Sequence, residues 1–179
     1  MAYEEPNYDV VHEAEGYEVR EYGDRVAAQV LQGANQNNAF GQLFKYISGA
    51  NQSSEKVSMT VPVAQSEKIQ MTVPVAQSVE SEGGYMQFFL PSSYTIETAP
   101  QPTNPDVQIV LVGGGNFAVR TFSGRASAAN FERATSKLLE RLLEDGVAPI
   151  SDVIRATYNG PLTPPFLRRN EVIVEIEWR

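Results

Sequence analysis

Apolar and polar side chains alternate along several short stretches of this 179-residue chain, a pattern typical of strands that bury one face. The clearest stretch is a tandem repeat, in which residues 55–66 are followed at once by residues 67–78 with ten of twelve positions identical. Each copy places valine, isoleucine or methionine at every second position, so we expect two strands. Because twelve is even, a slip by one copy keeps the same face inward, and the register must be fixed outside the repeat.

Further strands are expected on both sides of the repeat, from the same alternation and from the turn residues that bound it. They cover residues 16–22, 25–31, 85–90, 107–112, 117–122, 153–158 and 171–178. Glycine-containing links at residues 23–24 and 113–116 are typical of tight turns, so we expect the strands around each link to form a hairpin. Pro62 and Pro74 cannot donate to a ladder, and we expect them at edges or bulges.

Helical spacing of apolar residues predicts two helices. The first begins after Asn37 or Asn38 and ends near Gly49, and the second covers about residues 128–145 and ends at Gly146. The second is expected to turn these residues toward a core: Phe131, Thr135, Leu138 and Leu142, with the neighbouring Leu139 and Leu143. The order of hairpin, helix and strands occurs twice, which indicates an α+β chain of two similar halves.

The composition limits the classes of function and of partner that this chain can have. The length and a hydrophobic content of 42% predict a single domain, residues 1–179, and a formal charge of −8 argues against nucleic acid as a partner. The absence of cysteine excludes disulfides, thiolate catalysis and thiolate-ligated zinc or heme. No apolar stretch is long enough for a membrane span and the start lacks a signal-peptide pattern, so we expect a cytoplasmic protein by default; an exported form whose signal peptide has been removed would look the same.

Five phrases along the chain carry a family resemblance. They are GYEVREYGDRVAAQV at residues 16–30, FGQLFKYISGAN at 40–51, the repeated Lys-hydrophobic-x-Met-Thr-x-Pro-Val, FFLPSSYT at 88–95 and YNGPLTPPFLRRNEVIVEI at 158–176. In this order they resemble the SOUL family of heme-binding proteins. The resemblance implies a distorted antiparallel β-barrel flanked by two helices in two pseudo-symmetric halves, similar to effector-binding domains of bacterial regulators. It also implies non-covalent binding of heme or a related tetrapyrrole, as a carrier or buffer.

The same resemblance implies a hydrophobic groove beside the first helix. The matching residues are Phe40, Leu43, Phe44, Lys45 and Ile47. Lys45 would pair with a heme propionate, and Arg168 and Arg169, which follow the rigid Pro164-Pro165 turn, would supply a second anion contact. The same apolar residues would equally serve as the buried face of a helix, and the arginines as a solvated pair.

An iron ligand is harder to nominate. His12 is the only histidine, and the later histidine proposed as axial ligand in some SOUL proteins has no counterpart in this sequence. Met59 and Met71 offer thioethers but lie on the apolar face of the repeat, where a methionine is usually core. Tyr46 and Tyr158 are phenolate candidates whose sequence context is also explained by packing.

No motif nominates a nucleophile, so we expect a binding protein and not an enzyme. The alternative to heme is a module of the same fold that binds another hydrophobic ligand or a protein. The two copies of the repeat would form a hairpin through residues 64–68, whose exposed edge would extend the sheet of a second copy and form a homodimer.

Overall fold

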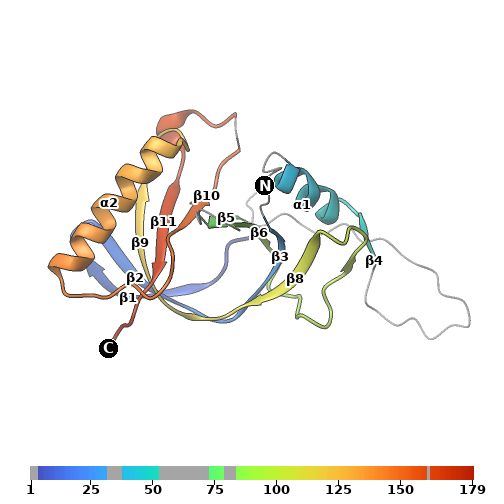
Figure 1. Ribbon diagram of the computed structural model, residues 1–179, viewed down its shortest axis with the longest axis horizontal. Helices are drawn as coiled ribbons and strands as arrows, with labels where there is room; N and C mark the ends of the chain where they lie inside the picture. Colours follow the sequence, from blue (N-terminus) through green and yellow to red (C-terminus); the bar gives the residue numbers. More distant parts are fainter. Residues whose placement is uncertain (1–3, 32–37, 53–72, 79–83, 161) are drawn as a thin grey trace, which may run out of the picture.

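The computed structural model describes residues 4–31, 38–52, 73–78, 84–160 and 162–179 (Figure 1). Most of the tandem repeat, including Met59 and Met71 and the expected hairpin, lies outside the described residues. Of the repeat, residues 73–78 are described, and they contain one strand. Within the described part, no helix is long and apolar enough to cross a membrane.

In the described residues the fold is α+β, a strongly curled antiparallel half-barrel of nine strands with two α-helices, as expected. The nine strands are β1 (Tyr8–Ala14), β2 (Tyr17–Tyr22), β3 (Arg25–Leu31), β5 (Val75–Ser78), β6 (Tyr85–Phe89), β8 (Val107–Val112), β9 (Gly115–Phe122), β10 (Ile154–Thr157) and β11 (Asn170–Glu175). Their order in the sheet is β1-β2-β9-β11-β10-β5-β6-β3-β8. The other elements are α1 (Ala39–Ile47), α2 (Ala128–Glu144), a small sheet of β4 (Asn51–Gln52) with β7 (Gln101–Pro102), and the 3₁₀ turn η2 (Pro165–Leu167).

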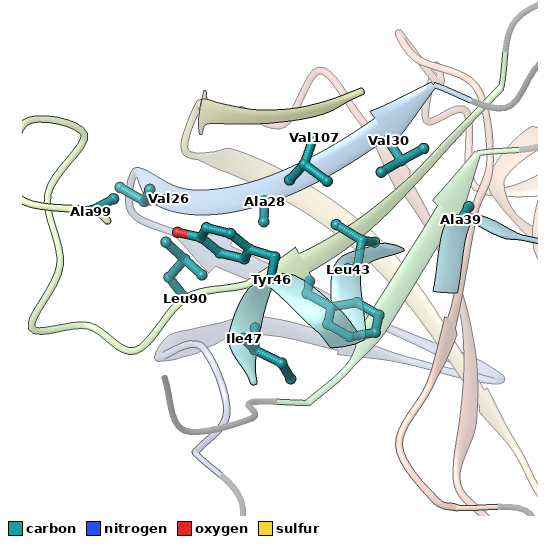
Figure 2. Packing of buried hydrophobic residues seen from close by; sticks show 11 residues of the cluster. Val26, Ala28, Val30, Ala39, Leu43, Tyr46, Ile47, Leu90, Ala99 and Val107 are labelled. Atoms are coloured by element: carbon teal, nitrogen blue, oxygen red, sulfur yellow. The ribbon is translucent and has the colours of Figure 1, made fainter. Parts of the chain in front are cut away.

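Helix α1 packs on one half of the sheet. Its buried residues Leu43, Tyr46 and Ile47 join a hydrophobic cluster with Val26 and Phe88 of β3 and β6 (Figure 2). The helix begins and ends where expected: Asn38 is the N-cap residue, although its side chain makes no capping hydrogen bond, and Gly49 follows the C-cap with a φ of +117°.

Helix α2 packs on the other half. Its buried residues Phe131, Ala134, Leu138 and Leu142 contact side chains of β2, β9 and β11. The expectation that Leu139 and Leu143 face the core is wrong: both are exposed, because the buried stripe follows steps of three and four residues from Phe131 and leaves these leucines beside it.

The hairpins expected around residues 23–24 and 113–116 are also wrong, although the strands on either side of each link are present. β2 does not pair with β3, nor β8 with β9. Instead, β2 pairs with β9 and β3 with β8. Tyr22 is opposite Gly115, and three residues further along each strand Arg25 is opposite Val112. The ladder therefore continues in one register through both glycine-containing links, and β2–β3 and β8–β9 are two long strands that bend together and cross from one half of the fold to the other.

The bend requires glycine for close approach of the two backbones. A Cβ on Gly114 would lie 2.4 Å from the carbonyl oxygen of Tyr22, and the Gly114 N–H donates to Oδ1 of Asp24 at 2.7 Å. Glycine here permits a tight crossing and not the reversal of the chain that it usually signals.

Two differences concern single strands. The polar, mostly exposed β1 was not expected, and it forms the actual N-terminal hairpin with β2 around Gly16, whose φ is +89°. Pro74 was expected at an edge or a bulge, and it directly precedes β5, which lies between β10 and β6 inside the sheet. The strand begins only after the proline, so the ladder does not need its missing N–H.

Candidate functional site

Phe40 and Phe44 form an exposed aromatic pair on the flank of α1. Their side chains are 47% and 48% exposed, and their rings lie nearly parallel, with centroids 6.2 Å apart and an interplanar angle of 12°. Phe40 also contacts the buried ring of Phe88 edge-on at 5.2 Å, which anchors the pair to the core. This surface, called the α1 aromatic pair, is a flat apolar platform beside the first helix.

The other residues of the expected groove lie elsewhere on α1. Leu43 and Ile47 are buried against the sheet, while Lys45 is exposed in the last turn. The helix thus divides the expected set into a core face and an exposed aromatic and basic flank. Contact of these residues with a ligand stays a prediction.

The two arginines have separate surroundings. Arg168 donates through Nε to the carbonyl oxygen of Thr163 and lines a shallow cavity between residues 125–127 and 162–168. Arg169 donates to Glu5 and Glu171 and lies over the ring of Tyr158, 3.8 Å from its centroid. Arg169 is therefore part of an internal polar cluster.

His12 is exposed on the edge strand β1, where its ring contacts that of Trp178 at a centroid distance of 5.0 Å. β1 and α1 lie on opposite sides of the molecule (Figure 1). In the described residues no group of three or more histidine, aspartate and glutamate side chains is placed to hold a metal ion. An iron bound at α1 would not have His12 as its ligand.

The inner face of the curled sheet carries a buried cluster around Glu171, whose side chain is 0% exposed. Its two carboxylate oxygens accept hydrogen bonds from both terminal nitrogens of Arg20 at 3.0 Å, from Nε of Arg169 at 2.9 Å and from the hydroxyl of Tyr158. The Thr121 hydroxyl is a further donor at 3.3 Å. The carboxylate has no acceptor site left for a ligand.

These contacts fix the charge states. Burial alone would raise the pKa of Glu171, but hydrogen bonds from Arg20 and Tyr158 and the charges of Arg20 and Arg169 lower it below its ordinary value. Burial and the neighbouring Glu171 raise the pKa of Tyr158, so this phenol stays protonated and is not a phenolate ligand. Tyr46 likewise donates its hydroxyl, to the carbonyl oxygen of Pro100 at 2.8 Å.

Next to this cluster lies a cavity of about 50 Å³. Its lining side chains come from all nine strands of the sheet: Tyr8, Tyr22, Arg25, Ala76, Gln87, Phe89, Val112, Phe117, Ile154 and Ile173. A cavity lined in this way lies inside the curl, opposite the face that the helices cover. Most of its lining is apolar, and its charged lining residues are Arg25 of β3 and Glu5, which precedes β1 and is paired with Arg169.

Sequence reasoning did not find this inner cluster. Its centre, Glu171, stands in the alternating stretch NEVIVEIEW, where the valines and isoleucines at even positions face α2. A glutamate at an odd position of such a strand indicates a side chain that faces solvent. The sequence does not show that the second face of this sheet is also enclosed. Arg20, which is 151 positions away in the sequence, likewise has the pattern of a solvent-facing residue. The two residues come together because β2 and β11 both pair with β9.

Comparison with known proteins shows a fold shared across distant sequences. A hydrolase from Listeria innocua aligns with 99% of this chain and 94% of its own at 11% identity, with a TM-score of 0.58. The EcmrR C-terminal domain aligns with 95% and 98% at 7% identity and a TM-score of 0.65. SAV2435, solved bound to tetraphenylphosphonium, aligns with 90% of this chain and 93% of its own at 6% identity and a TM-score of 0.51. At these identities the likeness shows the fold alone.

No curated protein matches this chain by sequence. The family comparison is decisive: residues 3–175 match the pattern of the SOUL heme-binding proteins, nearly the whole chain. The curled antiparallel sheet and the two helices agree with the fold expected from the resemblance. The chain therefore belongs to the SOUL heme-binding protein family.

Proposed function

We propose that this protein binds heme or a related tetrapyrrole non-covalently, as a carrier or buffer, on the surface beside α1. The observation that carries the proposal is the α1 aromatic pair. Two parallel rings, each about half exposed and anchored on Phe88, offer a flat apolar surface against which a planar macrocycle can stack. Family membership supplies the ligand class.

Lys45 follows Phe44 directly and is exposed, so its ammonium group supplies the cationic rim that a propionate needs. This arrangement does not require an iron ligand, because ring stacking and the contact with a propionate do not depend on a metal in the macrocycle. We therefore expect heme and metal-free protoporphyrin to bind with similar affinity.

The test is a titration of the purified chain with hemin and, separately, with metal-free protoporphyrin, followed by absorbance. Both should bind saturably at one to one. Phe44→Glu should weaken binding at least about tenfold, a loss of about 1.4 kcal/mol, because a carboxylate would have to be desolvated against the macrocycle. Phe166→Glu is the matched control, since Phe166 is an exposed phenylalanine of η2, and it should bind like the unaltered chain.

Three further variants separate a charge contact at Lys45 from iron ligation by His12. Lys45→Glu should weaken binding while Lys137→Glu, which reverses an exposed lysine on α2, should not. His12→Ala should leave both titrations unchanged. Binding that requires iron and disappears in His12→Ala would overturn the proposal, as would the absence of saturable binding of either porphyrin.

The internal cavity supports a second candidate function, the binding of a small hydrophobic ligand other than heme. SAV2435, a neighbour in fold, was solved with a lipophilic cation. This chain has an apolar cavity that its whole sheet encloses. One-to-one binding of a single-ring compound that survives Phe44→Glu would support this function, because the cavity and the α1 aromatic pair lie on opposite faces of the sheet.

A further inference from the structure

Arg25 is a partly buried cation that forms no ion pair with a carboxylate in the part of the chain that the structure describes. Its guanidinium is enclosed by three aromatic rings, with centroids of Tyr22, Phe89 and Phe117 at 4.4, 5.0 and 5.6 Å. Its Nε is buried and makes no hydrogen bond, and within the residues the structure describes no ion pair reaches it. Burial lowers the pKa of Arg25, which reflects the cost of keeping this charge out of water.

The carboxylates nearby are already used. Both oxygens of Glu171 are occupied by Arg20, Arg169 and Tyr158, and both oxygens of Glu5 accept from one terminal nitrogen of Arg169. Asp24, next to Arg25 in the chain, accepts from the backbone of the crossing strand. These three carboxylates therefore already accept hydrogen bonds from other donors, and none of them forms an ion pair with Arg25.

The guanidinium faces the cavity lined by all nine strands. A volume of about 50 Å³ corresponds to roughly three to five times the minimum for one water molecule, which suits a single ring or a short chain and not a macrocycle. Apart from Arg25 and Gln87, the sheet side chains of this wall are aliphatic or aromatic, including Val112 and Ile154. A small amphipathic molecule with one negative end matches both features.

We propose that this cavity binds a small organic monocarboxylate, whose carboxylate accepts hydrogen bonds from Arg25 and whose apolar body packs against Val112 and Ile154. The planar fork of a guanidinium matches the geometry of a carboxylate, and a pair formed away from water is strong. The proposal rests on the second candidate function and is independent of heme binding at α1.

A cationic ligand does not suit this cavity. The ring faces that would attract a cation already surround the guanidinium of Arg25, which would also repel it. Glu171 cannot serve as counter-ion without giving up contacts to Arg20 or Arg169. The chemistry of this chain thus differs from that needed for a lipophilic cation such as tetraphenylphosphonium.

The experiment uses three ligands with the same ring, benzoate, benzyl alcohol and benzylamine, titrated calorimetrically at one ionic strength. Benzoate should bind at one to one, and at least about tenfold more tightly than the alcohol; benzylamine should not bind. Arg25→Met, which keeps an apolar side chain among the rings, should weaken benzoate at least tenfold. Arg155→Met is the matched control, because Arg155 also lies over a phenylalanine ring, that of Phe131, on the opposite face of the sheet.

Arg25→Lys keeps the charge without the planar fork, and it should lie between the unaltered chain and Arg25→Met. It also protects the test should the methionine variant unfold. Equal benzoate affinity in all these proteins would overturn the assignment of Arg25. Preference for benzylamine would overturn the anionic ligand class while the cavity remained a ligand site, and no binding of any of the three would overturn the second candidate function as well.

Discussion

Replacing Glu171 by glutamine keeps the volume of a fully buried side chain and removes the charge that Arg20 and Arg169 share. Breaking a buried ion pair from one side costs about 3–5 kcal/mol, because the remaining charge is left without compensation. Here each arginine keeps one other carboxylate, Glu18 for Arg20 and Glu5 for Arg169. We therefore expect the lower end, a loss of about 3 kcal/mol in the free energy of unfolding.

The assay is urea unfolding followed by circular dichroism, with thermal unfolding in parallel. A loss of about 3 kcal/mol lowers the melting temperature by about 6–12 °C for a chain of this size. The control is Glu175→Gln, which removes the same charge from the same face of β11. Glu175 lies four residues after Glu171, and its side chain is only partly buried. An equal loss in both variants would refute the reasoning that the cluster stabilises the fold.

The pH dependence gives an independent check. The folded-state pKa of Glu171 is lower than its ordinary value of 4.5, so the unfolded chain takes up the proton first as the pH falls. The stability that the charge contributes is therefore complete above pH 4.5 and is lost as the pH falls from there through the folded-state pKa. The gap between the unaltered chain and Glu171→Gln should narrow below pH 4.5, and a gap that is constant with pH would contradict this assignment.

Other predictions follow from packing and capping. Leu43→Ala should cost about 2–5 kcal/mol because it empties a fully buried site under α1, whereas Leu143→Ala, at an 81% exposed position on α2, should change stability by less than about 0.5 kcal/mol. Gly114→Ala should cost about 1–3 kcal/mol, since its Cβ would meet a backbone carbonyl of the crossing strand 2.4 Å away, and Gly23→Ala, with open space around it, should cost less. Ser127→Ala should cost about 1 kcal/mol by removing the side-chain cap of α2. Chemical unfolding of each variant measures all of these.

The sequence predicted the elements of this fold better than their partners. Alternation identified eight of the nine sheet strands in the described part of the chain, including β5 within the second copy of the repeat. It missed β1, an exposed edge strand in which apolar alternation is weak. Both hairpin errors have one cause. A short glycine-containing link is typical of a chain reversal, and the sequence does not show that Gly114 instead lets another part of the backbone pass close by.

The candidate site was predictable only in part. The first helix has apolar residues over more than one face, and spacing alone does not say which of them the sheet covers; the structure buries Leu43 and leaves Phe40 and Phe44 exposed. The inner cluster and Arg25 were not predictable, because their burial depends on nine strands enclosing one space. A charged residue at an alternating position of a strand produces the same sequence pattern whether its side chain faces solvent or the enclosed inner face of a curled sheet.

The two long bent strands have a consequence for how the protein is made. Glu18 of β2 pairs with Val119 of β9, and Arg25 of β3 with Val112 of β8, so β2 and β3, which also pair with β1 and β6, meet these second partners only about a hundred residues later. At about 5–20 residues per second, synthesis leaves β2 without β9 for several seconds. A nascent chain that ends before residue 107 therefore lacks at least one strand of each half, and neither half can be completed until late in translation.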